Sequence, residues 1–458
     1  MRLVILYSVI FSILFSSCRK DEHTTTDPNA KLTLSKDIIL FDTLFTTIGS
    51  VTKTVKIINK NNDAVNISEL LLAGGNSSPF SININGQNAS SSTNLKLNGQ
   101  DSLNIFVKVS INPNTKNTPF LVQDSIIFQS NGNRQSIQLM AYGQNAVFIN
   151  NGVINSNTIW NNNLPYIING AVTILNNAKL DISPGAKIYF HKDAIMNIEG
   201  KLSVNGTTAE PVHFSSNRTE DIYANEPGQW KGIYIKRLGT GIINNAIIKN
   251  ASVGISSDSL SSSTEPKLIL ANSIIKNMQV AAFIGYHTEL LAFNNLIYNC
   301  GNYIIYGIGG GNYNLKQNTL AGFNPSFPRK NAALTFSDYI SSTSYNKLQL
   351  NLTNNIIWGS LTNELDIQKK TSLANELLIF NNLIKTTNTT YNSNNNTTNV
   401  DPLFTLAFKE NFELSSGSPA LAKGISLTTD QYYNLYLSKD LKNNTRTFPS
   451  SLGCFEKK

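Results

Sequence analysis

The sequence predicts an all-β chain in which an antiparallel β-sandwich is followed by a solenoid of short strands. Between residues 31 and 146, apolar and polar residues alternate over short runs separated by Gly and Asn-Gly turns. From residue 147 onward, strands rich in β-branched residues recur with a period in the twenties and without helical patterning. Because one such turn cannot bury its apolar side alone, stacking on the next turn must supply the core.

A hydrophobic–asparagine phrase marks the solenoid repeat, as in 271–277 (ANSIIKN) and 293–299 (FNNLIYN). Its copies align on a residue two positions before the first Ile or Leu, and they are spaced by 27, 22, 23, 37 and 27 residues. Asn tolerates the left-handed bend that ends a short strand, and stacked amides can hydrogen-bond to one another. We therefore expect a structural amide ladder. The aligned positions are Asn245, Asn272, Asn294, Gln317, Asn354 and Asn381.

This phrase resembles the right-handed parallel β-helix of the pectate-lyase-like superfamily, over roughly residues 150–458. The resemblance implies a β-helix over 147–458. Its last part, 401–456, is similar to the closing segment of bacterial β-helix surface proteins, which implies a cap on the last turn. The Thr- and Asn-rich tract 387–399 is predicted to be a mobile loop.

The sandwich segment, 31–146, is similar to immunoglobulin-like modules of the Hydin/SPD-2 type. It contains no Cys pair, so no immunoglobulin disulfide is expected. Such modules are spacers or protein-contact modules, and the resemblance assigns them no catalytic residue.

The first residues are typical of export. Residues 1–17 contain a short apolar run and form a predicted signal peptide. Small residues before Cys18 resemble the lipobox of bacterial lipoproteins, which implies lipid attachment at Cys18 and a tether over 18–30; the alternative is cleavage elsewhere beside an incidental Cys. The following Arg-Lys-Asp-Glu resembles the lipoprotein export signal of the Bacteroidetes. The resemblance implies an outer membrane lipoprotein exposed at the cell surface.

Composition excludes several classes of function. The formal net charge is +8, but Lys and Arg are scattered singly, so no nucleic-acid partner is expected. The four His and three Cys show no metal-ligand spacing, so no metal or cofactor is predicted, and Cys300 and Cys454 are expected to be buried free thiols. Five aromatic residues can stack on sugars or pack in the core. They are Trp160, Trp230, Trp358, Tyr303 and Tyr306.

Four Asp-Ser/Thr-apolar triplets resemble the O-glycosylation motif of the Bacteroidetes. The candidate hydroxyls belong to Thr43, Ser102, Ser125 and Ser259. The alternative is that Asp-Ser begins strands and turns.

Two functions remain open from the sequence. The first is a non-catalytic surface lipoprotein whose β-helix binds a polysaccharide or a surface protein. The second is a polysaccharide lyase or hydrolase acting along the β-helix groove, although the hydrolase phrases of the superfamily are absent and no catalytic residue is predicted. Two carboxylates, or a carboxylate and a Lys or Arg, converging on one exposed sheet would favour the enzyme.

Overall fold

The computed structural model describes residues 23–324, 328–370 and 374–457. The chain divides into two units, Met1–Asn145 and Ala146–Lys458, one residue from the predicted boundary. Cys18 and the predicted signal peptide lie outside the described residues. Within the described ranges, no helix is both long enough and apolar enough to cross a bilayer.

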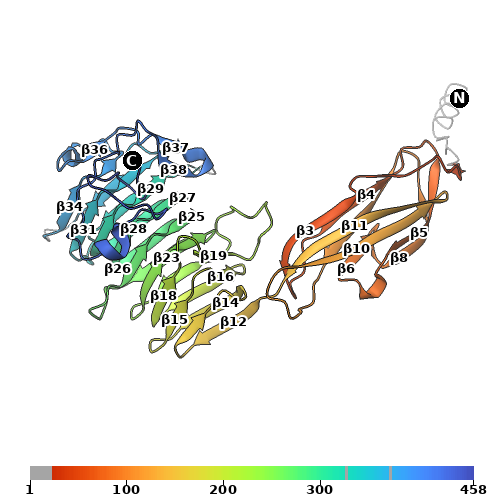
Figure 1. The fold of residues 1–458 in the computed structure, drawn as a ribbon, viewed down its shortest axis with the longest axis horizontal. Helices are drawn as coiled ribbons and strands as arrows, with labels where there is room; N and C mark the ends of the chain where they lie inside the picture. The colour runs from red at the N-terminus through yellow and green to blue at the C-terminus, as the bar shows by residue number, and fades with distance from the viewer. Residues whose placement is uncertain (1–22, 325–327, 371–373, 458) are drawn as a thin grey trace, which may run out of the picture. The chain divides into compact units, whose positions relative to one another are not determined.

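The first unit is a two-sheet β-sandwich (Figure 1). Strict alternation places Val55, Ile105 and Val107 in the core, where each is fully buried. One sheet contains β1 (Thr24–Thr25), β3 (Ile38–Phe45), β5 (Ala64–Leu72), β8 (Ser91–Leu97), β10 (Phe120–Ser130) and β11 (Asn133–Gln144). The other contains β2 (Thr33–Leu34), β4 (Lys53–Ile58), β6 (Phe80–Ile84), β7 (Gln87–Asn88) and β9 (Ser102–Val109), and the 3-10 turn η1 (Gly75–Ser77) precedes β6.

The described part of the predicted tether is bound to the sandwich. Thr24 and Thr25 of β1 pair with β5, and Ala30 is buried. The Asn131 and Asn133 side-chain amides donate to the Asp27 and Pro28 carbonyls at 3.1 and 2.8 Å. The predicted tether over 18–30 is therefore part of the sandwich over residues 24–30, where strand pairing, hydrogen bonds and the burial of Ala30 hold it.

The second unit is a parallel β-helix with three sheet faces (Figure 1). Face A contains β17 (Ile195–Ile198), β20 (Gly232–Ile235), β23 (Val253–Asp258), β30 (Leu334–Ser337) and β33 (Leu365–Gln368). Face B contains β13 (Thr158–Trp160), β15 (Lys179–Ile182), β18 (Lys201–Asn205), β21 (Thr240–Asn244), β24 (Leu268–Ala271), β31 (Leu348–Thr353) and β34 (Glu376–Phe380).

Face C completes each turn. Its strands are β16 (Lys187–Phe190), β19 (Val212–Ser216), β22 (Ala246–Lys249), β25 (Ile274–Met278), β27 (Leu296–Cys300), β29 (Thr319–Gly322), β32 (Ile356–Gly359), β35 (Leu383–Ile384) and β36 (Thr397–Thr398). Four longer strands cross a corner and join two faces: β12 (Val147–Ile154), β14 (Tyr166–Ile174), β26 (Ala281–Phe293) and β28 (Tyr303–Lys316).

The strand register follows the repeat of the sequence phrase. On face B the paired residues advance by 27, 22, 23, 37 and 27 residues, the same steps as the phrase. The pairs are Ile242 with Ile269, Ile269 with Leu291, Leu291 with Asn314, Asn314 with Asn351, and Asn351 with Leu378.

A continuous amide ladder lies at the bend between faces B and C, one residue later than expected. The four residues Asn295, Asn318, Asn355 and Asn382 are fully buried. From Asn318 onward, each side-chain oxygen accepts from the side-chain and backbone N–H groups of the preceding ladder residue. The side-chain bonds join Asn295 to Asn318, Asn318 to Asn355 and Asn355 to Asn382, at 2.9, 2.9 and 3.0 Å. The bonds from each backbone N–H measure 3.0, 3.0 and 2.9 Å.

The predicted ladder positions have a different part in the fold. All six take a left-handed backbone, with φ between 49 and 59°. A side-chain bond of 2.7 Å joins Asn294 to Asn272, but Asn354 and Asn381 instead donate to the carbonyls of Ile425 and Lys423. The predicted positions therefore turn the chain and anchor the C-terminal segment, while the residue after each of them points inward.

The C-terminal segment, residues 399–457, covers face C instead of capping the last turn. It contains β37 (Phe404–Leu406), η3 (Ala407–Lys409), β38 (Asn411–Leu414) and the π-helical turn η4 (Tyr433–Leu437). Leu414, Leu452 and Phe412 pack against apolar side chains on the outer side of face C, among them Trp358 and Tyr298. The segment also packs against the outer side of face B beside the ladder, because Leu437 contacts the cluster that includes Phe293.

The tract 387–399 occupies the position predicted for the cap. It contains η2 (Thr389–Asn392) and β36, which pairs with β35. The Asn382 amide donates to Asn396 at 3.1 Å, so Asn396 ends the ladder. Asn399 accepts from the Thr386 backbone N–H at 2.9 Å. The expected mobile loop is therefore a hydrogen-bonded end of the solenoid.

Candidate functional site

Face A carries five tyrosines on its outer side, which we call the tyrosine strip: Tyr234, Tyr286, Tyr303, Tyr306 and Tyr339. Strand alternation accounts for the direction of Tyr234, since Ile233 and Ile235 point into the core on either side of it. It does not account for Tyr303, which lies three residues before Tyr306 with Ile304 and Ile305 both buried between them, and Tyr339 follows the end of β30. The register joins Tyr234 to Tyr306 through Ser256 and Ile284 on the two intervening strands. Tyr286 is 43% exposed, and the other four are half-buried.

The centre of the strip is a stacked pair. The rings of Tyr303 and Tyr306 lie 4.3 Å apart with an interplanar angle of 12°. Burial is the main cause that raises the pKa of both hydroxyls, and the neighbouring phenols raise it further. Both hydroxyls therefore stay protonated at neutral pH. Tyr339 donates to Gln368 at 3.0 Å, and the Lys370 ammonium lies 4.2 Å from its ring centre. The strip therefore offers aromatic faces and neutral hydroxyls together.

A polar cleft of about 520 Å³ lies near the stacked pair. Asn331, which lines the cleft, donates to the Asn302 side chain at 2.6 Å, and Asn302 directly precedes Tyr303, so the cleft and the pair are neighbours. The lining is mainly amide, hydroxyl and charged groups. It comprises Lys330, Asn331, Ala332, Leu361, Asn363, Leu365, Asp366, Thr386, Thr387 and Asn388.

A buried ion pair fixes the walls of the cleft. The Arg329 guanidinium contacts both Glu364 oxygens at 2.5 and 2.6 Å, and neither side chain is exposed to solvent. Arg329 also donates to the carbonyls of Gly322 and Asn331, while Glu364 accepts from the Ala333 N–H. Because Arg329 precedes Lys330 and Glu364 follows Asn363, the pair holds two cleft walls together.

Asp258 and Asp366, two carboxylates of face A, do not form a hydrolase pair. Asp258 on β23 and Asp366 on β33 are separated by four strand spacings, or about 19 Å. Paired glycosidase carboxylates lie about 5–9.5 Å apart. Lys330 and Asp366 do line one cleft, although no ion pair joins them. Among the described residues, no group of three or more His, Cys, Asp or Glu could hold a metal.

Lys267 lies at the corner between faces A and B, where it binds Glu289 and is near Asp258. Its buried ammonium donates to the Lys236 and Arg237 carbonyls, both at 2.7 Å, and its backbone N–H donates to Glu289 at 2.9 Å. Burial lowers the pKa of Lys267 to about 8, opposed by the charge of Asp258. Because the amine is committed to two carbonyls, this group fastens the corner.

The other predicted site residues have structural surroundings. Trp160, Trp230 and Trp358 are buried, and Trp230 stacks on Phe190 at 4.0 Å. Cys300 and Cys454 are both buried and unpaired.

The four candidate glycosylation residues are half-buried, and the preceding Asp is hydrogen-bonded to three of them. Asp101 and Asp124 accept from the N–H groups of Ser102 and Ser125, both at 2.7 Å, and the Ser259 hydroxyl donates to Asp258 at 3.1 Å. Thr43 lies on β3.

Sequence reasoning named Tyr303 and Tyr306 but missed the cleft and Arg329. Arg329 forms its ion pair with Glu364. The partners are separated by 35 residues and meet only when two corners of successive turns stack. The sequence signal was the position of Glu364 directly before the apolar Leu365, at the start of a strand. A charged residue that is buried at such a position needs a partner of opposite charge.

Comparison with known proteins agrees with the second unit. A family model for a pectate-lyase like β-helix domain matches residues 152–265. No curated protein matches the chain. One similar solved structure is a family 123 glycoside hydrolase from Clostridium perfringens, at 12% identity and TM-score 0.19, covering 27% of this chain and 26% of that one.

A second is a PapD-like domain of human CEP192, at 11% identity and TM-score 0.18, covering 26% of this chain and 89% of that one. The chain thus spans about a quarter of the length of the hydrolase. Residues 152–265 are similar to pectate-lyase-like β-helix domains, and the parallel β-helix is the fold of the second unit.

Proposed function

We propose that the protein binds a polysaccharide on the outer side of face A, across the tyrosine strip and the polar cleft. The stacked Tyr303–Tyr306 pair beside the cleft carries this proposal. The C–H face of a sugar ring packs on an aromatic ring, while its hydroxyls bond to nearby amides and carboxylates. In this proposal Asn363, Asn388 and Asp366 supply those polar contacts.

The proposed setting is the cell surface. The lipid on Cys18 would hold the chain at the outer membrane, and the sandwich would separate the β-helix from the lipid. The apolar run before Cys18 and the following Arg-Lys-Asp-Glu support this setting by their resemblance to exported lipoproteins.

Binding is tested by measuring affinity for a panel of polysaccharides with Tyr306→Ala and Tyr303→Ala. We expect at least tenfold weaker binding in each variant, which corresponds to about 1.4 kcal/mol. Tyr142→Ala is the matched control, because this tyrosine is 40% exposed and belongs to the first unit. Equal affinity in all four proteins would show that the strip is not the binding surface.

Cleavage is the second candidate, and the presence of Lys330 and Asp366 in one cleft favours it. The test is release of reducing or unsaturated ends from each polysaccharide that binds. If chain ends appear, and Asp366→Asn or Lys330→Gln abolishes them without weakening binding, the protein is an enzyme. The non-catalytic proposal expects no chain ends from the wild-type protein.

A further inference from the structure

Strand β6 forms part of an open edge of the sandwich. Its pairing with β9 continues at both ends, where Ser110 donates to the Pro79 carbonyl at 2.9 Å and Asn85 donates to the Asn104 carbonyl at 3.3 Å. Residues 79, 81, 83 and 85 therefore direct their backbone groups toward β9. By alternation, Phe80, Ile82 and Ile84 direct theirs away from it.

Only part of that outward edge is covered. Strand β7 pairs with Asn83 and Ile84, and Ala89 donates to the Ile82 carbonyl at 3.3 Å. The Ser78 hydroxyl accepts from the Phe80 N–H at 3.1 Å. Two groups are left without a partner in the described part of the chain, the N–H of Ile82 and the carbonyl of Phe80. They lie on either side of Ser81.

This donor and acceptor match one residue of a parallel strand. In a parallel ladder, a residue opposite Ser81 would donate its N–H to the Phe80 carbonyl and accept from the Ile82 N–H at its own carbonyl. An antiparallel strand would use the same two groups, because the residues before and after the one opposite Ser81 would then accept from the Ile82 N–H and donate to the Phe80 carbonyl. The pattern therefore selects an extended polypeptide added beside β6 in either direction.

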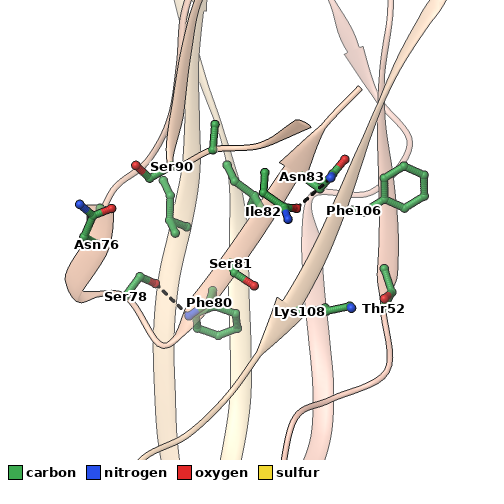
Figure 2. Close-up of a pocket in the computed structure, with 14 residues that line it drawn as sticks. Thr52, Asn76, Ser78, Phe80, Ser81, Ile82, Asn83, Ser90, Phe106 and Lys108 are labelled. Carbon is green, nitrogen blue, oxygen red and sulfur yellow. Dashed lines mark hydrogen bonds between the residues drawn. The ribbon is translucent and has the colours of Figure 1, made fainter. Parts of the chain in front are cut away.

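Space for that strand is present beside the edge. Two adjoining hollows of about 890 and 780 Å³ lie along β6. Figure 2 shows the first, with Ser78 bonded to Phe80 and with Ser81 and Lys108 beside it. The two hollows share the lining residues Asn76, Ser78, Phe80, Ser81 and Lys108, so they are continuous.

The charge of the hollows indicates the chemistry of the partner. Their described lining includes Lys108 and no Asp or Glu. Ser81 pairs with Lys108 across β6 and β9, so a residue opposite Ser81 lies about 10 Å from the Lys108 backbone, within reach of a lysine side chain and an acid. We propose that the β6 edge binds an extended acidic segment of a partner protein as an added strand.

The test uses the full mature chain and synthetic hexapeptides of alternating Thr and Val with one central Asp. One control peptide carries Lys in place of Asp. Another carries N-methyl groups on the Asp amide and on the amide that follows it, the two amides that can donate to the Phe80 carbonyl in a parallel or an antiparallel strand. We expect the Asp peptide to slow hydrogen exchange of the Ile82 N–H at least tenfold. N-methylation should weaken binding at least tenfold, because it removes the hydrogen bond to Phe80.

Charge reversal provides the protein-side control. Lys108→Glu should weaken binding of the Asp peptide at least tenfold and strengthen binding of the Lys peptide. Lys56→Glu changes another exposed lysine on the same sheet and should leave both affinities unchanged. Unchanged exchange at Ile82, equal binding of the N-methylated peptide, or no binding of the Asp peptide at millimolar concentration would each overturn the proposal.

Discussion

Truncation of one ladder amide, Asn318→Ala, should destabilise the β-helix by about 2–4 kcal/mol. The Asn318 oxygen accepts from the Asn295 backbone N–H at 3.0 Å and from its side chain at 2.9 Å. After truncation, the Asn295 side chain keeps its bond to the Leu270 carbonyl, but the backbone N–H is buried and loses its acceptor. One such group costs about 1–3 kcal/mol, and the lost Asn318 donor bonds add about 1 kcal/mol.

The substitution at Asn318 introduces no backbone strain. Asn318 lacks the left-handed φ that its neighbour Gln317 has, so Ala is accommodated without strain. Asn177→Ala is the matched control, because this amide is exposed and should change stability by less than about 0.5 kcal/mol. Asn318→Ser should recover part of the loss, since the Ser273 hydroxyl already accepts from the Ala246 N–H at 3.0 Å in the equivalent place.

The assay is urea unfolding followed by circular dichroism, with the unfolding slope compared among the four proteins. An Asn318→Ala protein whose unfolding free energy lies within 0.5 kcal/mol of wild type would refute the reasoning. It would mean that water or a backbone shift satisfies the Asn295 N–H.

Four further predictions concern the cysteines and the exported state. Burial raises the pKa of both Cys300 and Cys454 to about 12, so iodoacetamide at pH 8 should label neither in the native protein and both in urea. The unfolded thiols ionise near pH 8.5 while the native ones do not, so stability should fall as the pH rises above that value. Cys18→Ser should move the protein from the membrane to the soluble fraction and abolish acyl labelling; unchanged fractionation would contradict lipidation. Ser259 should carry a glycan in the native host, and an intact mass equal to that of heterologously produced protein, after allowance for the lipid, would exclude it.

The sequence phrase was sufficient to predict the strand steps but not which of two neighbouring amides points inward. In Asn294-Asn295 and Asn354-Asn355 both residues are Asn, whereas Asn272 is followed by Ser273. The alignment therefore favoured the first position, which is the left-handed one. The direction of a side chain inside a bend depends on the backbone angle φ, and the residue type alone does not determine that angle.

The face that the C-terminal segment covers has a signal in the sequence. Strands covered on both sides read as continuous apolar runs instead of alternating ones. On face C, Leu296-Ile297-Tyr298 and Ile356-Ile357-Trp358 are such runs. They indicate that something packs on the outside of these turns. The polar cleft had no comparable signal, because it depends on loops that meet only after the turns stack.

The choice of face A for the proposed ligand follows from how the other two faces are used. Face C is covered by the C-terminal segment from β25 to β35. That segment is tied to the ladder bend, where Arg446 donates to Asn294 at 2.7 Å and to the Gly453 carbonyl at 2.9 Å. It also covers the part of face B around Phe293. Face A contributes to none of the described clusters that pack against this segment, so its aromatic side chains remain available to a ligand.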